Sequence, residues 1–159
     1  MSLEISNFAE NFRAIYFRGI PRLLNDDGAY LSFGCSFSGT EALAGYRYPR
    51  ENANGVKFKD FLVEYFDPPY RPLAAQFWDL RNSVVHGFSP KHFALCHGQP
   101  AAHFTDHPPF VKVLNADSFF RDFQVAAERY LHALTTDATI QSLFEERLLS
   151  AKGGGLYVG

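Results

Sequence analysis

Apolar residues recur every three or four positions along most of the chain, which is the spacing of amphipathic helices. The first stretch predicts a helix, broken near Pro21, with an apolar face of Phe8, Phe12, Ile15, Gly19 and Leu23. The next stretch, residues 28–46, is apolar and rich in small residues, which predicts a buried helix in close contact with its neighbours. An alternative is that Ser38 and Glu41 form a capping box that divides this stretch into two helices.

Two more helices follow the turn-forming residues 49–55. The third ends at residues 67–69, Asp-Pro-Pro, and its apolar face consists of Phe58, Phe61, Leu62, Tyr65 and Phe66. The fourth starts near Arg71, with Pro72 suited to the first turn, and its apolar face consists of Leu73, Phe77, Leu80 and Val84.

The pattern changes between Ser89 and Leu114, where short apolar runs alternate with turn residues. This pattern predicts a small β-hairpin or a three-stranded flap. Helical spacing returns afterwards, with Asn115 and Asp117 as candidate caps of a fifth helix. Thr136 or Asp137 can cap a last helix.

The simplest fold class is therefore mainly α: an up-and-down helical bundle with a small β insertion at about residues 89–114. Residues 1–151 are expected to form one domain, and residues 152–159 a flexible tail. A chain of 159 residues buries about two-thirds of its unfolded surface, so we expect it to fold without a metal or a disulfide.

Composition narrows the class of protein. The chain is 47% hydrophobic and 16% aromatic, which excludes disorder and predicts a core rich in rings. The formal net charge of -2 provides no general attraction to phosphate backbones, so contact with nucleic acid requires a local basic patch. Two cysteines, Cys35 and Cys96, fit a reducing compartment, although one disulfide between them remains open.

The apolar runs and the first residues of the sequence indicate the cellular location of the protein. No run approaches the roughly 20 residues that span a bilayer, and residues 1–8 lack the charged start and apolar core of a signal peptide. We expect a cytoplasmic protein with no membrane contact.

Candidate chemistry gathers at the end of the fourth helix, in residues 81–88, RNSVVHGF. Asn82 and His86 are four residues apart and therefore point the same way, and Arg81 lies about 100° around the helix axis from Asn82. Gly87 can end the helix in a left-handed conformation, which leaves His86 in the last turn. There an imidazole can exchange protons near neutral pH, and an arginine offers a planar fork for phosphate oxygens.

The same residues allow a structural interpretation. His86 can simply close the helix, while Arg81 pairs with a nearby acid such as Asp79 or Glu41. A structural salt bridge is the expected role of both acids.

The Arg81-Asn82-x-x-x-His86-Gly87 motif, late in a bundle of this length, resembles the HEPN (higher eukaryotes and prokaryotes nucleotide-binding) family. The resemblance implies an α-helical bundle that dimerises with its motif helices facing. It also implies a metal-independent endoribonuclease that cleaves single-stranded RNA through attack of the 2′-hydroxyl, without a cofactor. Arg81 would hold the phosphate, His86 would transfer protons and Asn82 would orient the histidine or the substrate. A non-catalytic nucleotide-binding, scaffold or dimerisation module is the alternative.

Family members of the toxin type have an antitoxin or a nucleotidyltransferase as partner, and the resemblance extends that expectation to this chain. Some members carry a tyrosine two residues after the histidine, which the nucleotidyltransferase modifies. This chain has Phe88 there, which argues against control by that route.

Two further groups of residues belong to the sequence-based hypothesis. Arg71 and Lys91 are candidate substrate-binding cations near the motif, and Arg47 and Arg50 lie in a preceding loop with aromatic neighbours. Five residues resemble metal ligands in type, but their spacing matches no common zinc pattern, so no metal is expected; they are His92, Cys96, His97, His103 and His107.

Overall fold

The computed structural model describes residues 3–150, and it is mainly helical with one small sheet, as the sequence predicts. The six α-helices are α1 (Leu3–Phe12), α2 (Ala29–Arg47), α3 (Asn54–Tyr65), α4 (Ala74–His86), α5 (Ala116–Thr136) and α6 (Ala138–Ser150). The shorter helical turns are η1 (Arg13–Phe17), η2 (Ile20–Leu23), η3 (Pro68–Leu73) and η4 (Pro100–Ala102). The strands are β1 (Phe93–Cys96) and β2 (Lys112–Asn115).

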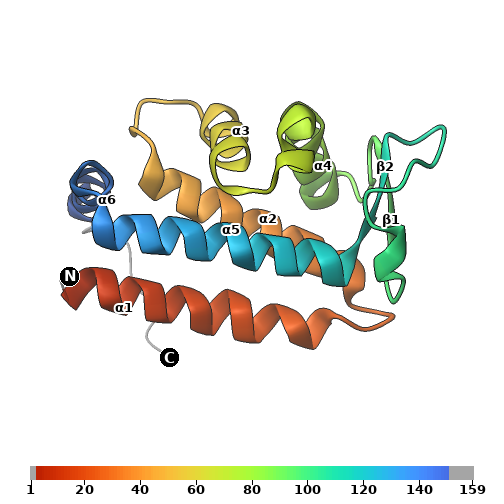
Figure 1. The fold of residues 1–159 in the computed structure, drawn as a ribbon, viewed down its shortest axis with the longest axis horizontal. Coiled ribbons are helices and arrows are strands. Elements are labelled where there is room, and N and C mark those ends of the chain that lie inside the picture. Colours follow the sequence, from red (N-terminus) through yellow and green to blue (C-terminus); the bar gives the residue numbers. More distant parts are fainter. Residues whose placement is uncertain (1–2, 151–159) are drawn as a thin grey trace.

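Helices α1, α2 and α5 run lengthwise through the molecule, with α2 and α5 in the middle (Figure 1). Helices α3 and α4 lie on the opposite side of this layer from α1, and both are foreshortened in the view because they cross it. Helix α6 closes one end of the molecule, and the two strands lie at the other end. The helices are therefore bundled, but only some of them run up and down.

The first helix differs from the predicted one because its middle is a π-helical turn, η1. A π-turn adds one residue to the repeat and rotates the subsequent residues around the helix axis. Ile15, which was expected on the buried face, is consequently 50% exposed. Tyr16 packs inward instead, with its ring 4.6 Å from that of Phe12.

Helix α2 is continuous from Ala29 to Arg47, so the alternative in which a capping box divides it is wrong. Its buried hydroxyls bond to carbonyls one turn earlier, as Ser36 Oγ does to Ser32 O at 2.9 Å. Gly39 lies at a close contact between α2 and α5, since a Cβ there would be 2.6 Å from the Phe123 ring. The small residues of α2 thus allow close packing, as the sequence predicts.

The core is a cluster of aromatic rings between α2, α4 and α5. Phe119 is buried at its centre and packs 6.0 Å from Phe77, 5.3 Å from Phe33 and 5.1 Å from Phe37, measured between ring centroids. Burial of this many rings removes a large apolar area from water, which supplies the main driving force for folding.

The β insertion contains two strands that pair in parallel, with Phe93 opposite Lys112 and Cys96 opposite Asn115. The prediction of a hairpin or a three-stranded flap is therefore wrong in topology, because a hairpin joins antiparallel strands. The chain crosses through η4 and an extended loop before β2 begins, so both strands run in the same direction. We call residues 89–115 the flap.

Two predicted helix caps are confirmed. Asn115 Oδ1 accepts from the Ser118 amide at 3.0 Å, and Asp137 Oδ1 accepts from the Thr139 amide at 2.8 Å. Asn115 is also the last residue of β2, so the flap leads into α5 with no residue between them.

Three sequence-based expectations concern the rest of the chain. Cys35 and Cys96 are both free thiols. Within residues 3–150, no helix combines the length and the apolar character needed to cross a membrane. The tail expected at residues 152–159 lies outside the described residues.

Candidate functional site

Arg81 lies between α4 and α2, where its guanidinium group is held by three bonds. Its Nε and one terminal nitrogen both donate to Glu41 Oε2, the former at 2.9 Å. Its other terminal nitrogen donates to Asn82 Oδ1 at 3.0 Å. Arg81 is 19% exposed and Glu41 24%, so the pair is partly buried and still reachable from water. Of the two acids that the sequence offered, Glu41 is the partner of Arg81.

The Trp78 ring packs against the guanidinium group of Arg81. The Arg81 guanidinium carbon lies 5.4 Å from the centroid of the Trp78 ring, a cation–π arrangement. Gly55 on α3 contacts the same ring, since a Cβ at that position would be 2.8 Å from it. Sequence reasoning missed Trp78, although its position three residues before Arg81 places both on one side of a helix.

His86 occupies the last turn of α4 and is exposed. The helix ends where the Gly87 amide donates to Ser83 O at 2.9 Å. Gly87 has φ -124°, so the prediction that it ends the helix in a left-handed conformation is wrong. The left-handed residue is Phe88, with φ 48°. Its ring, 81% exposed, lies 4.7 Å from the Tyr30 ring at the start of α2.

A second exposed histidine reaches α4 from the flap. His92 Nε2 lies 3.1 Å from Asp79 Oδ2, and Asp79 stands one turn before Asn82 on the same helix. His92 has φ 67°, an uncommon conformation for a residue other than glycine. Its carbonyl accepts from the Val111 amide at 2.7 Å, which fixes the backbone. The structure therefore aligns Asp79, Asn82 and His86 along one side of α4, with His92 in contact with Asp79.

Only part of the expected basic surface lies near this site. Lys91 is exposed in the flap next to His92, whereas exposed Arg71 lies in η3, before the first turn of α4. Arg71 and His86 are thus at opposite ends of α4. Arg47 bonds to Glu64 at 2.8 Å, and Arg50 lies at the end of the molecule that α6 closes. The loop at residues 46–50 therefore does not join the motif.

The other histidines of the flap each have a different environment. His97 lies between Asp26 and Asp117, at 3.4 Å and 3.6 Å. His107 stacks on Phe110. Among residues 3–150, no three side chains of histidine, cysteine, aspartate or glutamate gather in an arrangement that could hold a metal ion.

His103 belongs to a partly buried polar cluster that joins the flap to η3 and α5. Its Nδ1 accepts from the Asn115 amide at 3.1 Å, and its Nε2 lies 3.3 Å from Asp122 Oδ2. Buried Tyr70 donates to the same carboxylate oxygen at 2.9 Å. Burial acts to raise the pKa of Asp122, but the bonds from His103 and Tyr70 outweigh it and lower that pKa below its usual value.

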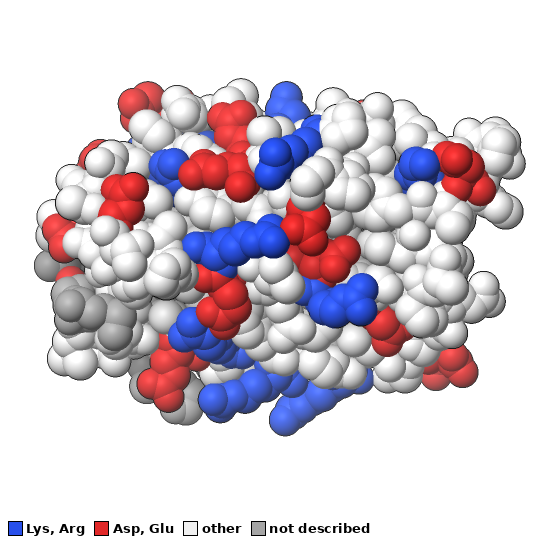
Figure 2. All heavy atoms as spheres, in the orientation of Figure 1, with Lys and Arg blue, Asp and Glu red and all other residues white. Residues whose placement is uncertain are grey.

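Charge on the face that carries α1 and α5 is mixed. Figure 2 shows lysines and arginines interspersed with aspartates and glutamates there, with neither sign forming a continuous field. A large basic surface for nucleic acid is therefore not present on this face, in keeping with the net charge.

No protein-family model, no curated protein and no solved structure matches this chain. The fold and the site define its class as a helical bundle that carries a supported Arg–Asn pair and exposed histidines along one helix edge.

Proposed function

We propose that this chain is a HEPN-like, metal-independent endoribonuclease that cleaves single-stranded RNA. The observation that carries the proposal is the arrangement along α4: Arg81 is supported by Trp78 and Glu41 and bonded to Asn82, while His86 is exposed on the same helix. A fixed guanidinium can stabilise the charge that develops on the phosphoryl oxygens, and an exposed imidazole can transfer a proton during RNA transesterification.

The proposed reaction needs no metal or added reactant. The 2′-hydroxyl oxygen attacks the adjacent phosphorus, the bond from phosphorus to the 5′-oxygen breaks, and a 2′,3′-cyclic phosphate remains. One proton leaves the 2′-hydroxyl and one is delivered to the 5′-oxygen. Arg81 would stabilise the charge that develops on the phosphoryl oxygens, because its donors not bonded to Glu41 or Asn82 can reach a ligand. Asn82 would orient Arg81.

Two proton-transfer groups are needed, since the attacking and leaving oxygens lie on opposite sides of the phosphorus. His86 supplies one of them. His92 is the second candidate within the same chain, because Asp79 orients its ring and its backbone is fixed. In a dimer, His86 of the partner subunit could fill the same role. Lys91, next to His92, would contribute charge toward the substrate, while Arg71 is too far along α4 to act with His86.

The test is cleavage of a panel of single-stranded RNAs in EDTA, with an otherwise identical DNA as control. Wild type should leave cyclic phosphate ends on RNA and spare DNA, which lacks the 2′-hydroxyl. His86→Ala should lower the rate by about 10²-fold or more. Arg81→Lys should remain poorly active, because an ammonium cannot reproduce the planar fork. His92→Ala tests whether His92 is the second proton-transfer group. An unchanged cleavage rate in this variant would show that another residue has that role.

His132→Ala is the matched control, because His132 is an exposed histidine on α5 whose side chain has no role in the proposal. It should cleave at the wild-type rate. Full activity in a folded His86→Ala protein would contradict the proposal, because the cleavage would then belong to another site or another protein.

A second candidate function is a non-catalytic nucleotide-binding or scaffold module. The observation in its favour is the Arg81–Glu41 pair, which already neutralises the charge that a phosphate would meet. In this case wild type cuts none of the RNAs, and Arg81→Ala lowers the melting temperature because it leaves Glu41 without its partner.

A further inference from the structure

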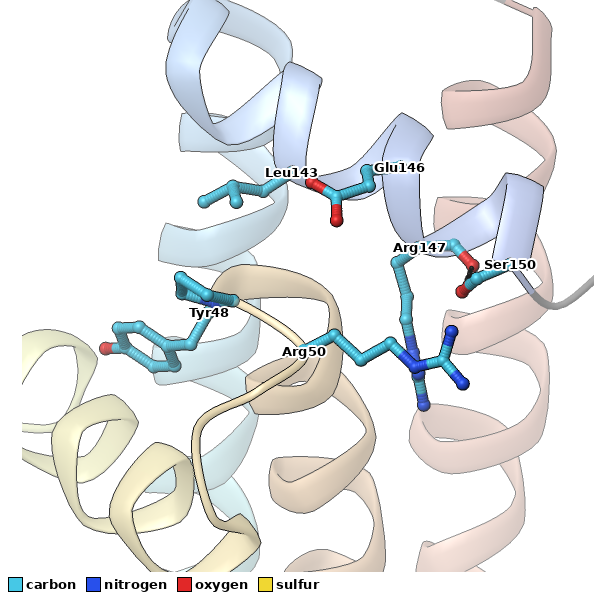
Figure 3. A pocket seen from close by; sticks show the side chains of 7 residues that line it. Tyr48, Arg50, Leu143, Glu146, Arg147 and Ser150 are labelled. Atoms are coloured by element: carbon cyan, nitrogen blue, oxygen red, sulfur yellow. Dashed lines mark hydrogen bonds between the residues drawn. The ribbon is translucent and has the colours of Figure 1, made fainter.

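Two arginines line a pocket where the loop after α2 meets α6, far from the α4 motif, and a buried lysine lies behind that loop. Arg50 and Arg147 line a small pocket together with Tyr48, Pro49, Leu143, Glu146 and Ser150. Figure 3 shows Arg50 extending from the loop and Arg147 from α6, and the ends of the two side chains overlap in this view. The third cation is Lys57 on α3, whose Nζ donates to the carbonyl of Arg50 at 3.3 Å.

These three cations form no ion pair with a carboxylate among the described residues. Among the described residues, no carboxylate oxygen lies within 4.0 Å of a side-chain nitrogen of Arg50, Arg147 or Lys57. Glu146 lines the pocket and Glu51 lies near Lys57, but neither forms an ion pair with them. The three positive charges are therefore not directly neutralised by Glu146 or Glu51.

The burial of Lys57 makes this group of positive charges unfavourable for the stability of the folded protein. It is only 4% exposed, and burial lowers its pKa, as do the charges of Arg147 and Arg50, against a smaller opposing effect of Glu51. A buried ammonium within reach of the charges of two guanidinium groups disfavours the folded protein unless an anion compensates. An occupied pocket would remove that cost.

We propose that this pocket binds the phosphate group of a small phosphate monoester, with Arg50 and Arg147 as its two direct ligands. Two planar guanidinium forks match the several oxygens of one phosphate, and Lys57 adds a positive charge behind them. Tyr48, Pro49 and Leu143 supply an apolar wall beside the cations. Tyr48 is held in place, because its hydroxyl donates to Glu64 at 2.6 Å and Arg47 lies over its ring. This binding site is independent of RNA cleavage.

Calorimetry on the full chain tests the proposal with inorganic phosphate, AMP and adenosine, in chloride buffers of equal ionic strength. Phosphate and AMP should both bind, AMP the more tightly, and adenosine alone should bind far more weakly than AMP. Arg50→Gln and Arg147→Gln should each weaken AMP binding about tenfold or more. Arg22→Gln, which removes an exposed arginine of η2, is the matched control and should bind as wild type does.

Lys57→Met gives an independent test with two results of opposite sign. The variant should melt at a higher temperature than wild type in chloride, because a buried cation beside two others is gone. It should also gain less melting temperature from AMP than wild type does. No binding of either phosphate compound would overturn the proposal, as would AMP binding that both arginine variants retain. Binding of inorganic phosphate without AMP would overturn the monoester as ligand.

Discussion

At the scale of single residues, the contacts of Asp122 make a pH dependence predictable. Its pKa is lowered in the folded protein, despite burial, by the bonds from His103 and Tyr70, with Arg121 nearby. A carboxyl group with a lowered folded pKa stabilises the fold fully above its unfolded pKa of about 4, and this stabilisation is lost as pH falls through the folded pKa.

We therefore expect Asp122→Asn to lower the free energy of unfolding at pH 7 by about 1–3 kcal/mol. The difference between wild type and variant should shrink as the pH falls below about 4. Urea unfolding across this range measures both effects. Asp60→Asn, at an exposed position of α3, is the control and should differ little from wild type at any pH. A difference that stays constant down to strong acid would contradict the assignment to the Asp122 charge.

Individual contacts were predictable where they depend on local spacing. Asn115 and Asp137 cap helices as the sequence indicates, because a cap needs only residues two or three positions away. Glu41 was one of two acids, with Asp79, that the sequence offered as partners of Arg81. The pairing of His92 with Asp79 was not predicted, since it depends on where the flap folds back onto α4. The cluster of Lys57, Arg50 and Arg147 was not predicted either, since it depends on how α6 packs against the loop after α2.

At the scale of elements, Gly39 allows α2 to pack closely against Phe123 of α5. A methyl group there would meet the Phe123 ring at 2.6 Å, and that ring is buried and cannot move freely. We expect Gly39→Ala to destabilise the protein by about 1–3 kcal/mol through overpacking.

Gly45 offers a control on the same helix, because a Cβ there would have no neighbour within 4 Å. Gly45→Ala should stabilise the protein by up to about 1 kcal/mol, since alanine favours the helix more than glycine does. Thermal unfolding of the two variants measures the contrast. Equal effects at both positions would show that packing against Phe123 does not limit the approach of α2.

The number and order of helices were predictable from apolar spacing, whereas their irregularities were not. The π-turn η1 exposes Ile15, because a one-residue insertion in the repeat leaves no mark on composition. The strands were found, but not their direction, since alternation of apolar residues is the same in parallel and antiparallel pairs. The prediction of a left-handed Gly87 was wrong by one residue, since Phe88 adopts that conformation instead.

At the scale of the whole molecule, exposed apolar side chains near the motif support the proposed homodimer. Leu31 on α2, Val85 on α4 and Phe88 beyond it are all exposed, and Phe88 packs beside Tyr30. Exposed apolar side chains that form one patch on a small protein are a common site of self-association. A symmetric contact through it would bring two α4 motifs together.

We expect sedimentation at micromolar concentration to give a dimer, and Phe88→Asp to give a folded monomer, because a charge cannot be buried there without a partner. Val63→Asp, at an exposed apolar position of α3, is the control and should stay dimeric. A wild-type protein that sediments only as monomer, at low and moderate salt, would remove the prediction.

The aromatic core was foreseeable from composition, as was the mixed charge on the face that Figure 2 shows. The position of each ring in the cluster around Phe119 was not, since it depends on the angles at which α4 and α5 cross.

The direct passage from β2 into α5 links the stability of two parts of the protein. Asn115 pairs with β1 through its backbone, caps α5 through its side chain, and its amide holds His103. Detachment of the flap would therefore displace Asn115 from the Ser118 amide and separate His103 from Asp122 on α5. The flap and the start of α5 consequently belong to one cooperative unit, whose amides should exchange with solvent only through a shared opening.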